Sequence, residues 1–194
     1  SDKDPSVILL HYPSILEDTI NYIPPRVKIE ISCLSMDEPT ELRPIRSLIG
    51  ESFDGEDTDA ESLVRTVVPT RTFLEKLFLL AEEFQKEKPR SVRMSRHLYD
   101  LEKLMDTEYG KDALSNRKLY DAIVEHRKTY YALKYVNYDL HTPSTINFTI
   151  PESAMEAWQD DYADMRRFFI YGESLEFGAL IQKMKELQER VRIM

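Results

Sequence analysis

The chain has 194 residues, of which 42% are hydrophobic and 31% charged, and its formal net charge is −9. This composition is typical of a soluble globular protein that forms its own core, and the length fits one domain or one domain with an appended piece. A run of about 18 apolar residues does not occur, which excludes a membrane-spanning helix, and the acidic balance argues against broad nonspecific binding of nucleic acid.

The first part of the chain predicts two strands separated by irregular segments. Residues 1–25 are expected to form an irregular lead-in, because prolines interrupt them repeatedly. The stretch RVKIEIS alternates, with Val27, Ile29 and Ile31 on one side, which is typical of a strand. Residues 37–59 are expected to form a loop with short turns, and SLVRTVVP is the second predicted strand.

The rest of the chain predicts mostly helix, because apolar residues recur there with a period near 3.6. The predicted helical ranges are 72–87, 95–106, 115–135, 152–170 and 174–192. Thr72 followed by Glu75 fits a capping box, and Ser95 and Ser174 are the predicted caps of two later helices. Between them, Thr145–Ile150 alternates and is a candidate short strand.

These patterns together predict an α+β fold, in which a small mixed sheet packs against a mostly helical C-terminal region. The predicted boundary divides the chain into residues 1–69 and 70–194. Cys33 is the single cysteine, so an internal disulfide framework is excluded. Its place in an apolar run predicts a buried thiol, and a cytoplasmic protein is the natural expectation.

Generic catalytic motifs are scarce in this sequence. It contains no glycine-rich phosphate loop and no Gly-x-Ser-x-Gly elbow, and its four histidines lack the i, i+4 spacing of metal ligands. Composition and periodicity alone therefore lead to a mostly helical domain with a small sheet. A noncatalytic module that binds RNA or a protein partner remains an open interpretation.

Several segments, taken in order, resemble one protein family. They are RTFLEKLFLLAEEFQ, RMSRHLYDLEKLM, IVEHRKTYY and DYADMRRFFIYGE, with YIPPRVKIEIS upstream of them. Their order and spacing are similar to the C-terminal half of bacterial AbiEii/AbiGii-type nucleotidyltransferases, over roughly residues 22–190.

The resemblance implies a DNA polymerase β-like enzyme that transfers a nucleotide from an NTP to an RNA acceptor such as tRNA, with Mg²⁺ as cofactor. It also implies that the protein is the toxin of a toxin–antitoxin pair, with a cognate antitoxin. In this family, two aspartates in a Gly-Ser…Asp-x-Asp segment near the N-terminus bind the metal ions. No Gly-Ser or Gly-Gly followed by Asp-x-Asp precedes the VKIEIS strand here. The chain is therefore expected to be a C-terminal part that is inactive on its own.

The resemblance assigns the two main catalytic candidates to neighbouring helices. Lys76 matches the family's helix lysine, which would contact the triphosphate as a point charge. The alternative is a lysine whose aliphatic stem covers the margin of the core. Asp100 matches the family's helix aspartate and would orient Lys76 or a substrate group. The alternative for Asp100 is an ion pair with Arg96 or Lys103 on its own helix.

The remaining candidates are one carboxylate and three basic side chains. Glu30, on the polar face of its strand, is a candidate third carboxylate that would act as a general base or as an auxiliary metal ligand. The alternative is an outward glutamate beside Lys28. Arg71, Arg96 and His97 are candidates for contacts with phosphate or RNA, against purely structural or solvent-exposed roles.

Overall fold

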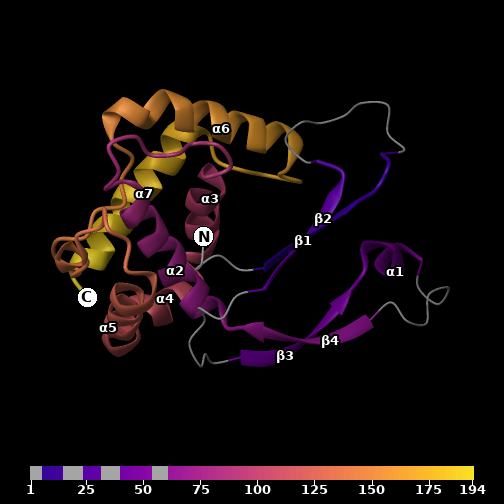
Figure 1. The fold of residues 1–194 in the computed structure, drawn as a ribbon, viewed down its shortest axis with the longest axis horizontal. Coiled ribbons are helices and arrows are strands. Elements are labelled where there is room, and N and C mark those ends of the chain that lie inside the picture. Colours follow the sequence, from indigo (N-terminus) through magenta and orange to yellow (C-terminus); the bar gives the residue numbers. More distant parts are fainter. Residues whose placement is uncertain (1–5, 15–23, 32–39, 54–60) are drawn as a thin grey trace.

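The fold is taken from a computed structural model, which describes residues 6–14, 24–31, 40–53 and 61–194. Figure 1 shows a body of packed helices and two β-hairpins that project from one side of it. The strands are β1 (Ser6–His11), β2 (Arg26–Ile31), β3 (Thr40–Arg46) and β4 (Glu61–Val67). The helices are α1 (Leu48–Ser52), α2 (Pro69–Glu83), α3 (Ser95–Leu104), α4 (Glu108–Ser115), α5 (Arg117–His126), α6 (Met155–Phe168) and α7 (Phe177–Arg192).

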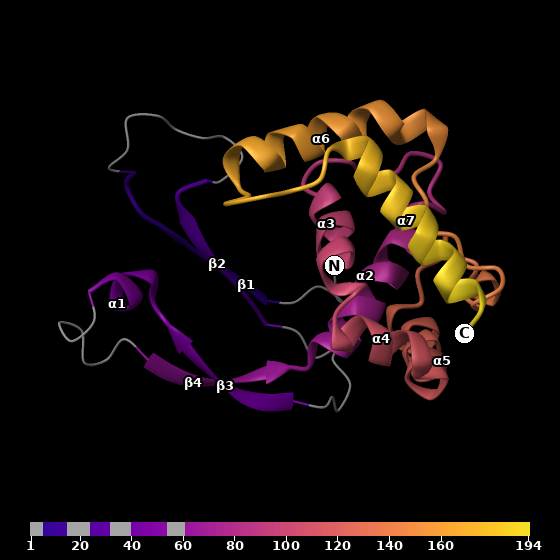
Figure 2. The same cartoon turned by 180° about the vertical axis from the view of Figure 1, so that it is seen from behind.

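The strands form two separate antiparallel hairpins. β1 pairs with β2, so that Ile8 lies opposite Ile29, and β3 pairs with β4, so that Arg43 lies opposite Val64. Seen from behind, both hairpins still project from the same side of the helices (Figure 2). The α+β class and the strands at β2 and β4 are confirmed. The expected single mixed sheet is wrong, because the described strands form two sheets of two strands each.

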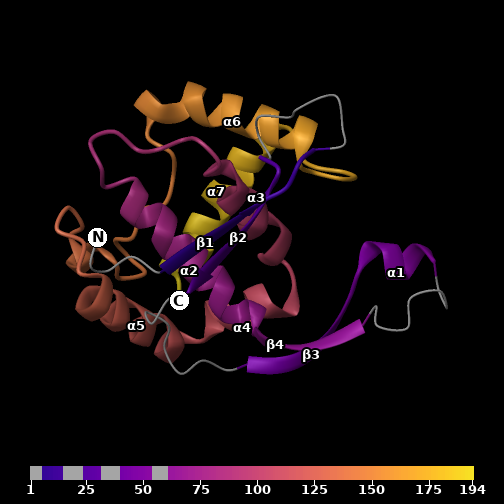
Figure 3. The ribbon, with the colours of Figure 1, turned by 45° about the vertical axis from the view of Figure 1, so that its right-hand side comes forward.

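Two predicted irregular segments contain regular structure. β1 lies within the expected lead-in of residues 1–25, and β3 and α1 lie within the expected loop of residues 37–59. α1 sits at the far end of the β3–β4 hairpin, away from the helical body (Figure 3). Both strands escaped prediction because they lack a clean alternation: β1 is a continuous apolar run, and β3 carries Pro44, which cannot donate a backbone hydrogen bond.

α2 forms the centre of the helical body. Its apolar residues face α3, α4 and α5, while α3 in turn packs against α6 and α7. The buried core contains side chains from six helices and from the segment before α6, namely Phe73, Phe78, Leu101, Ala113, Tyr120, Phe148, Trp158, Tyr162 and Leu187. Burial of so many apolar side chains is the main favourable contribution to the stability of this part of the chain.

α2 starts earlier than predicted. Its first helical residue is Pro69 and its N-cap is Val68, so the capping box assigned to Thr72 and Glu75 is wrong. Proline is favoured at the first helical position because its fixed φ suits a helix and its missing N–H is not needed there. Glu75 instead accepts hydrogen bonds from the side chains of Arg71 and Arg127.

The start of α3 donates its hydrogen bonds to a residue on another helix. The Asp161 carboxylate on α6 accepts hydrogen bonds from the backbone N–H of Arg93 at 2.5 Å, the N–H of Ser95 at 3.0 Å and the Ser95 hydroxyl at 2.5 Å. Ser95 is therefore the first helical residue rather than the cap. Asp161 is only 8% exposed, and it satisfies donors that the start of α3 would otherwise leave unpaired.

The predicted helix over residues 115–135 is shorter than expected, and α4, which lies before it, was not predicted. Asn116 ends α4 and caps α5, because its side chain accepts a hydrogen bond from the Leu119 N–H at 3.0 Å. α5 then continues into a π-helical turn, Arg127–Tyr131. This turn stops at Ala132, whose φ of 45° lies in the left-handed region.

The candidate strand Thr145–Ile150 is not a strand. A buried glutamine replaces the missing partner strand: the Gln188 side chain accepts from the Phe148 N–H at 3.2 Å and donates to the Ile146 carbonyl at 2.7 Å. The apolar alternation of this segment arises because Ile146, Phe148 and Ile150 are buried against the helical body.

The last two helices are confirmed, with shorter limits than predicted. A 3₁₀ turn, Glu152–Ala154, leads into α6, and Gly172 adopts a φ of +94° in the segment between α6 and α7. Ser174 does not cap α7, because its hydroxyl accepts from Arg166 Nε at 3.1 Å. None of the described helices is long and apolar enough to cross a membrane. Cys33 lies outside the described residues.

Candidate functional site

Lys76 and Asp100 meet between two adjacent helices. Lys76 Nζ on α2 lies 2.5 Å from Asp100 Oδ2 on α3, and the side chains are 23% and 36% exposed. The lysine therefore does more than cover the core margin, and the partner of the aspartate is neither Arg96 nor Lys103. Lys103 instead lies 3.2 Å from Glu102. A charge-assisted hydrogen bond of this kind holds the ammonium group at a fixed place on the surface.

A pocket of about 500 Å³ adjoins this ion pair. α2, α3 and α6 contribute its walls, together with the residues that follow α6. Its lining residues are Lys76, Arg96, His97, Tyr99, Asp100, Met165, Phe169, Ile170 and Tyr171. The volume is within the usual range for small-molecule sites. The pocket lining thus combines two cations and a carboxylate with apolar and aromatic side chains.

His97 is held neutral in this pocket. Burial, followed by the positive charges of Lys76, Arg96 and Arg90, lowers the pKa of His97 to about 3. The residue is 8% exposed, and within the described ranges no group makes a hydrogen bond to its Nδ1. At neutral pH its ring therefore carries no charge, with one nitrogen as a hydrogen-bond donor and the other as an acceptor.

Arg71 lies elsewhere, in a buried ion network. Its guanidinium donates to Glu75 at 2.7 Å, and Glu75 also bonds to Arg127. Arg127 makes a bidentate ion pair with Glu82, in which Nε lies 2.7 Å from Oε1 and Nη2 lies 2.5 Å from Oε2. Its guanidinium also lies over the Tyr131 ring. The proposed role of Arg71 in substrate contact has no support from this geometry, because its side chain is only 4% exposed.

The network also fixes the protonation state of Arg127. Burial on its own would lower the pKa of this guanidinium, but the carboxylates of Glu82 and Glu75 outweigh it and raise the pKa. Two glutamate carboxylates balance the charge of this arginine and accept its hydrogen bonds, which indicates a structural role for Arg127.

Glu30 is not brought to the pocket. It lies on exposed β2 and forms a 2.7 Å ion pair with Lys28, which is the alternative considered for it from the sequence. Within the described residues, no group of three or more His, Cys, Asp or Glu side chains is placed to hold a metal ion. The Mg²⁺ expected from the family resemblance therefore does not fit any carboxylate set in this part of the chain.

The sequence interpretation missed the aromatic side of the pocket. Phe169, Ile170 and Tyr171 follow α6 directly, and Tyr171 is 97% exposed. In Figures 1 and 2 this segment lies at the end of α6 on the side from which the hairpins project. The signal was present as the apolar run FFIY before Gly172, at a point where helical periodicity ends.

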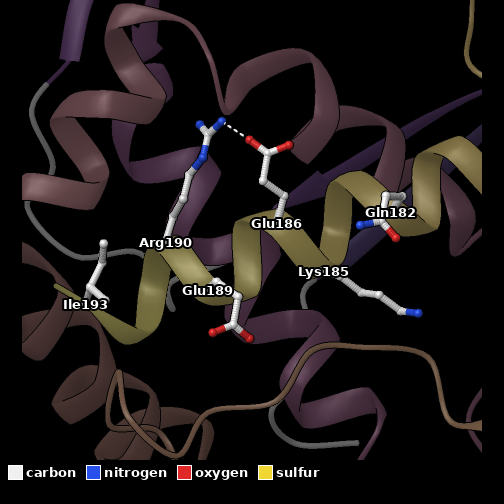
Figure 4. A pocket seen from close by; sticks show the side chains of 6 residues that line it. All are labelled: Gln182, Lys185, Glu186, Glu189, Arg190 and Ile193. Carbon is white, nitrogen blue, oxygen red and sulfur yellow. Dashed lines mark hydrogen bonds and ion pairs between the residues drawn. The ribbon is translucent and has the colours of Figure 1, made fainter.

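A second concavity, of about 590 Å³, lies along α7 and has a different character. Its lining residues are Gln182, Lys185, Glu186, Glu189, Arg190 and Ile193, and Figure 4 shows that their side chains point in different directions. Glu186 is already paired with Arg190 on the same helix. Such i, i+4 pairs are common on solvated helix faces and indicate no chemistry.

Comparison with known proteins places the chain in a family. The family model described as nucleotidyl transferase AbiEii toxin, type IV TA system, matches residues 1–184. No curated protein and no solved structure matches the chain. The matched range includes both members of the Lys76–Asp100 pair and the aromatic segment after α6, and it confirms the resemblance found in the sequence. The chain therefore belongs to the AbiEii family of nucleotidyl transferase toxins of type IV toxin–antitoxin systems.

Proposed function

We propose that this chain forms the triphosphate-contacting part of an enzyme that transfers a nucleotide from an NTP to an RNA acceptor, with a tRNA end as the first candidate. The observation that carries the proposal is the 2.5 Å Lys76–Asp100 pair at the edge of a pocket of about 500 Å³. Family membership supplies the reaction class, and the pair supplies a positioned cation.

Lys76 is the group that contacts the substrate. Its ammonium is a compact positive charge suited to the phosphate oxygens of an NTP. Negative charge develops on the departing pyrophosphate during transfer, and a cation fixed beforehand stabilises that charge without reorganising. Asp100 is a positioning residue in this proposal, because its carboxylate holds the ammonium from the α3 side.

Arg96 and His97 extend the same surface. Arg96 is exposed on α3 and lines the pocket, where its planar guanidinium suits two phosphate oxygens at once. The neutral ring of His97 suits a hydroxyl or a ribose oxygen better than a phosphate, because it brings no charge of its own. These two residues would orient the nucleotide beside Lys76.

The metal ions that this reaction class uses need carboxylates from outside the described residues. No Gly-Ser…Asp-x-Asp segment precedes the VKIEIS strand, and on this ground we infer that the 194-residue chain does not transfer nucleotides by itself. A longer protein with a Gly-Ser…Asp-x-Asp segment ahead of this sequence is expected to be active with Mg²⁺.

The test measures transfer of labelled nucleotide from each NTP to total tRNA, with Mg²⁺ and with a chelator. In the longer protein, Lys76→Ala should lower the rate about 10²-fold, as expected for losing one charge-stabilising group. Asp100→Asn should also be severely impaired. Lys103→Ala is the matched control, because Lys103 is an exposed lysine on α3 outside the pocket lining.

Three outcomes would contradict the proposal in different ways. Metal-dependent transfer by the 194-residue chain would mean that other carboxylates suffice. Full activity of Lys76→Ala would reduce the lysine to a packing residue. Binding of RNA by the longer protein without any transfer would favour a noncatalytic RNA-binding module instead.

The biological setting is part of the same proposal. The family description supports a toxin whose effect is counteracted by a cognate antitoxin. The single cysteine supports a cytoplasmic site of action, because a reducing compartment does not favour disulfide-rich proteins. Loss of toxicity in cells that express Lys76→Ala in the longer protein would link the pocket to this setting.

A further inference from the structure

We propose that Tyr171 and Phe169 form a stacking wall for the base of the NTP whose triphosphate contacts Lys76. This inference rests on the proposed function and adds a binding element to the same pocket. Both aromatic residues line the pocket together with Lys76 and Arg96. A nucleotide has an anionic tail and a planar aromatic base, and the pocket offers a partner for each.

The aromatic residues are presented to solvent rather than used in the core. Tyr171 is 97% exposed and Phe169 is 48% exposed, whereas Trp158 and Tyr162 on the preceding helix are buried. An exposed ring gains contact area when a planar ligand covers it, and stacking on aromatic side chains works for any base. Such a wall therefore contributes affinity for the nucleotide without selecting one base strictly.

The segment that carries the wall is anchored at its beginning. The N–H groups of Phe169 and Ile170 both donate to the Met165 carbonyl, at 2.9 and 3.0 Å, so the chain leaves α6 in a fixed direction. Gly172 then turns the chain with a φ of +94°, a conformation that glycine adopts without steric cost. Tyr171 thus lies immediately before a sharp turn.

The segment is also anchored at its end. Arg166 donates from Nε to the Ser174 hydroxyl at 3.1 Å and forms a 2.6 Å ion pair with Glu176. The Tyr162 hydroxyl donates to the Leu175 carbonyl at 2.8 Å. Bonds on both sides of Tyr171 limit how far it can move, which lowers the entropy lost when a ligand orders it.

The experiment compares two ligands on the 194-residue chain by calorimetric titration at low salt. One ligand is inorganic tripolyphosphate, and the other is each of ATP, GTP, CTP and UTP in turn. At least one NTP should bind about 10-fold more tightly than tripolyphosphate, the order expected for stacking one base. Tyr171→Ala should remove this advantage and leave tripolyphosphate binding unchanged.

Two further variants separate stacking from general apolar contact. Tyr171→Phe keeps the ring and should keep the advantage of the NTP, whereas Tyr171→Leu keeps apolar bulk and should lose it. Tyr130→Ala is the matched control, because Tyr130 is 57% exposed and lies outside the lining of this pocket. Because Tyr171 is almost fully exposed, its replacement should leave the fold intact, which circular dichroism checks.

The outcomes distinguish this inference from the proposed function. If tripolyphosphate binds in a manner that Lys76→Ala abolishes, but no NTP binds more tightly, the stacking wall is wrong and the triphosphate role stands. If tripolyphosphate does not bind, but NTP binding depends on Tyr171, the wall stands and the role of Lys76 is wrong. If neither ligand binds, both are overturned.

Discussion

The helical body and the two hairpins use the same apolar residue types in opposite ways. Leu77 and Leu187 in the body are 0% exposed, whereas Leu9 in β1 is 41% exposed and Leu63 in β4 is 67% exposed. Each hairpin consists of two strands held by backbone hydrogen bonds, and an isolated two-stranded hairpin is only marginally stable in water. The pocket lies in the part with its own core, so its geometry does not depend on the hairpins.

Charged side chains show the same contrast. Arg127 and Glu82 pair with side chains that are 5% and 4% exposed, whereas Lys28 and Glu30 pair on β2 at 47% and 52% exposure. Water screens the exposed pair, so it contributes little to stability. The intact buried pair contributes little net free energy, because removing both charges from water is costly. Removing only one partner is strongly destabilising, because the other charge is then left buried without a counter-ion.

The largest effect is expected for the buried network. Arg127→Met should lower the free energy of unfolding by about 3–5 kcal/mol, because Glu82 would remain buried without its cation. Urea unfolding followed by far-UV circular dichroism measures this loss. Lys28→Met is the matched control for the hairpin and should change the value by only a few tenths of a kcal/mol. Equal losses in both variants would contradict the contrast between buried and exposed charge.

A pair of leucine truncations tests the apolar side of the comparison. Leu77→Ala should cost about 2–5 kcal/mol, because it leaves a cavity in the core of the body. Leu63→Ala on β4 should change the unfolding free energy by about 0.5 kcal/mol or less, because that side chain is already in water. A large loss in Leu63→Ala would mean that the β3–β4 hairpin is covered in solution.

A smaller effect should appear as a pH dependence of the body. Burial, followed by the charge of Arg127, lowers the pKa of His141 to about 4 from an ordinary value of 6.5. Below pH 6.5, His141 therefore becomes protonated in the unfolded chain, whereas in the folded chain it stays neutral down to about pH 4. The stability contributed by a neutral His141 is present above pH 6.5 and is lost as the pH falls.

For His141 alone, this loss amounts to about 1.5 kcal/mol between pH 6.5 and pH 5. His141→Gln removes the titrating ring, so its unfolding free energy should fall by that much less over the same range. Urea unfolding of both proteins at the two pH values gives the difference. An identical pH dependence in the two proteins would show that His141 is protonated in the folded state or open to water.

The sequence predicted the five helices α2, α3, α5, α6 and α7, because burial on one face produces a regular apolar period, and it missed α1 and α4. It failed where a distant group decides the local structure. Nothing near Ser95 indicates that Asp161 will satisfy the start of α3, and nothing near Phe148 indicates that Gln188 will replace a partner strand. β1 and β3 were missed for a related reason, since each is recognised through the strand with which it pairs.

The candidate site could be predicted for residues that the family motif identifies. It could not be predicted where contacts with distant residues determine whether a side chain faces the pocket. Lys76 and Asp100 came from the resemblance, and the structure brings them together. Arg71 belongs to the same motif, but its guanidinium bonds to Glu75, which also bonds to Arg127, so Arg71 is part of a buried ion network. The position of Arg127, 52 residues after Glu75, gives no local signal of this contact.

The Asp161 carboxylate also sets the order in which the protein can assemble during synthesis. The first turn of α3 depends on a residue that is made 66 positions after Ser95. At about 5–20 residues per second, the ribosome needs several seconds to synthesise that interval. α3, which carries Asp100, therefore remains without its N-terminal partner until α6 has emerged. The nascent chain consequently lacks a finished pocket until α6 and the residues after it, which line the pocket, have been synthesised.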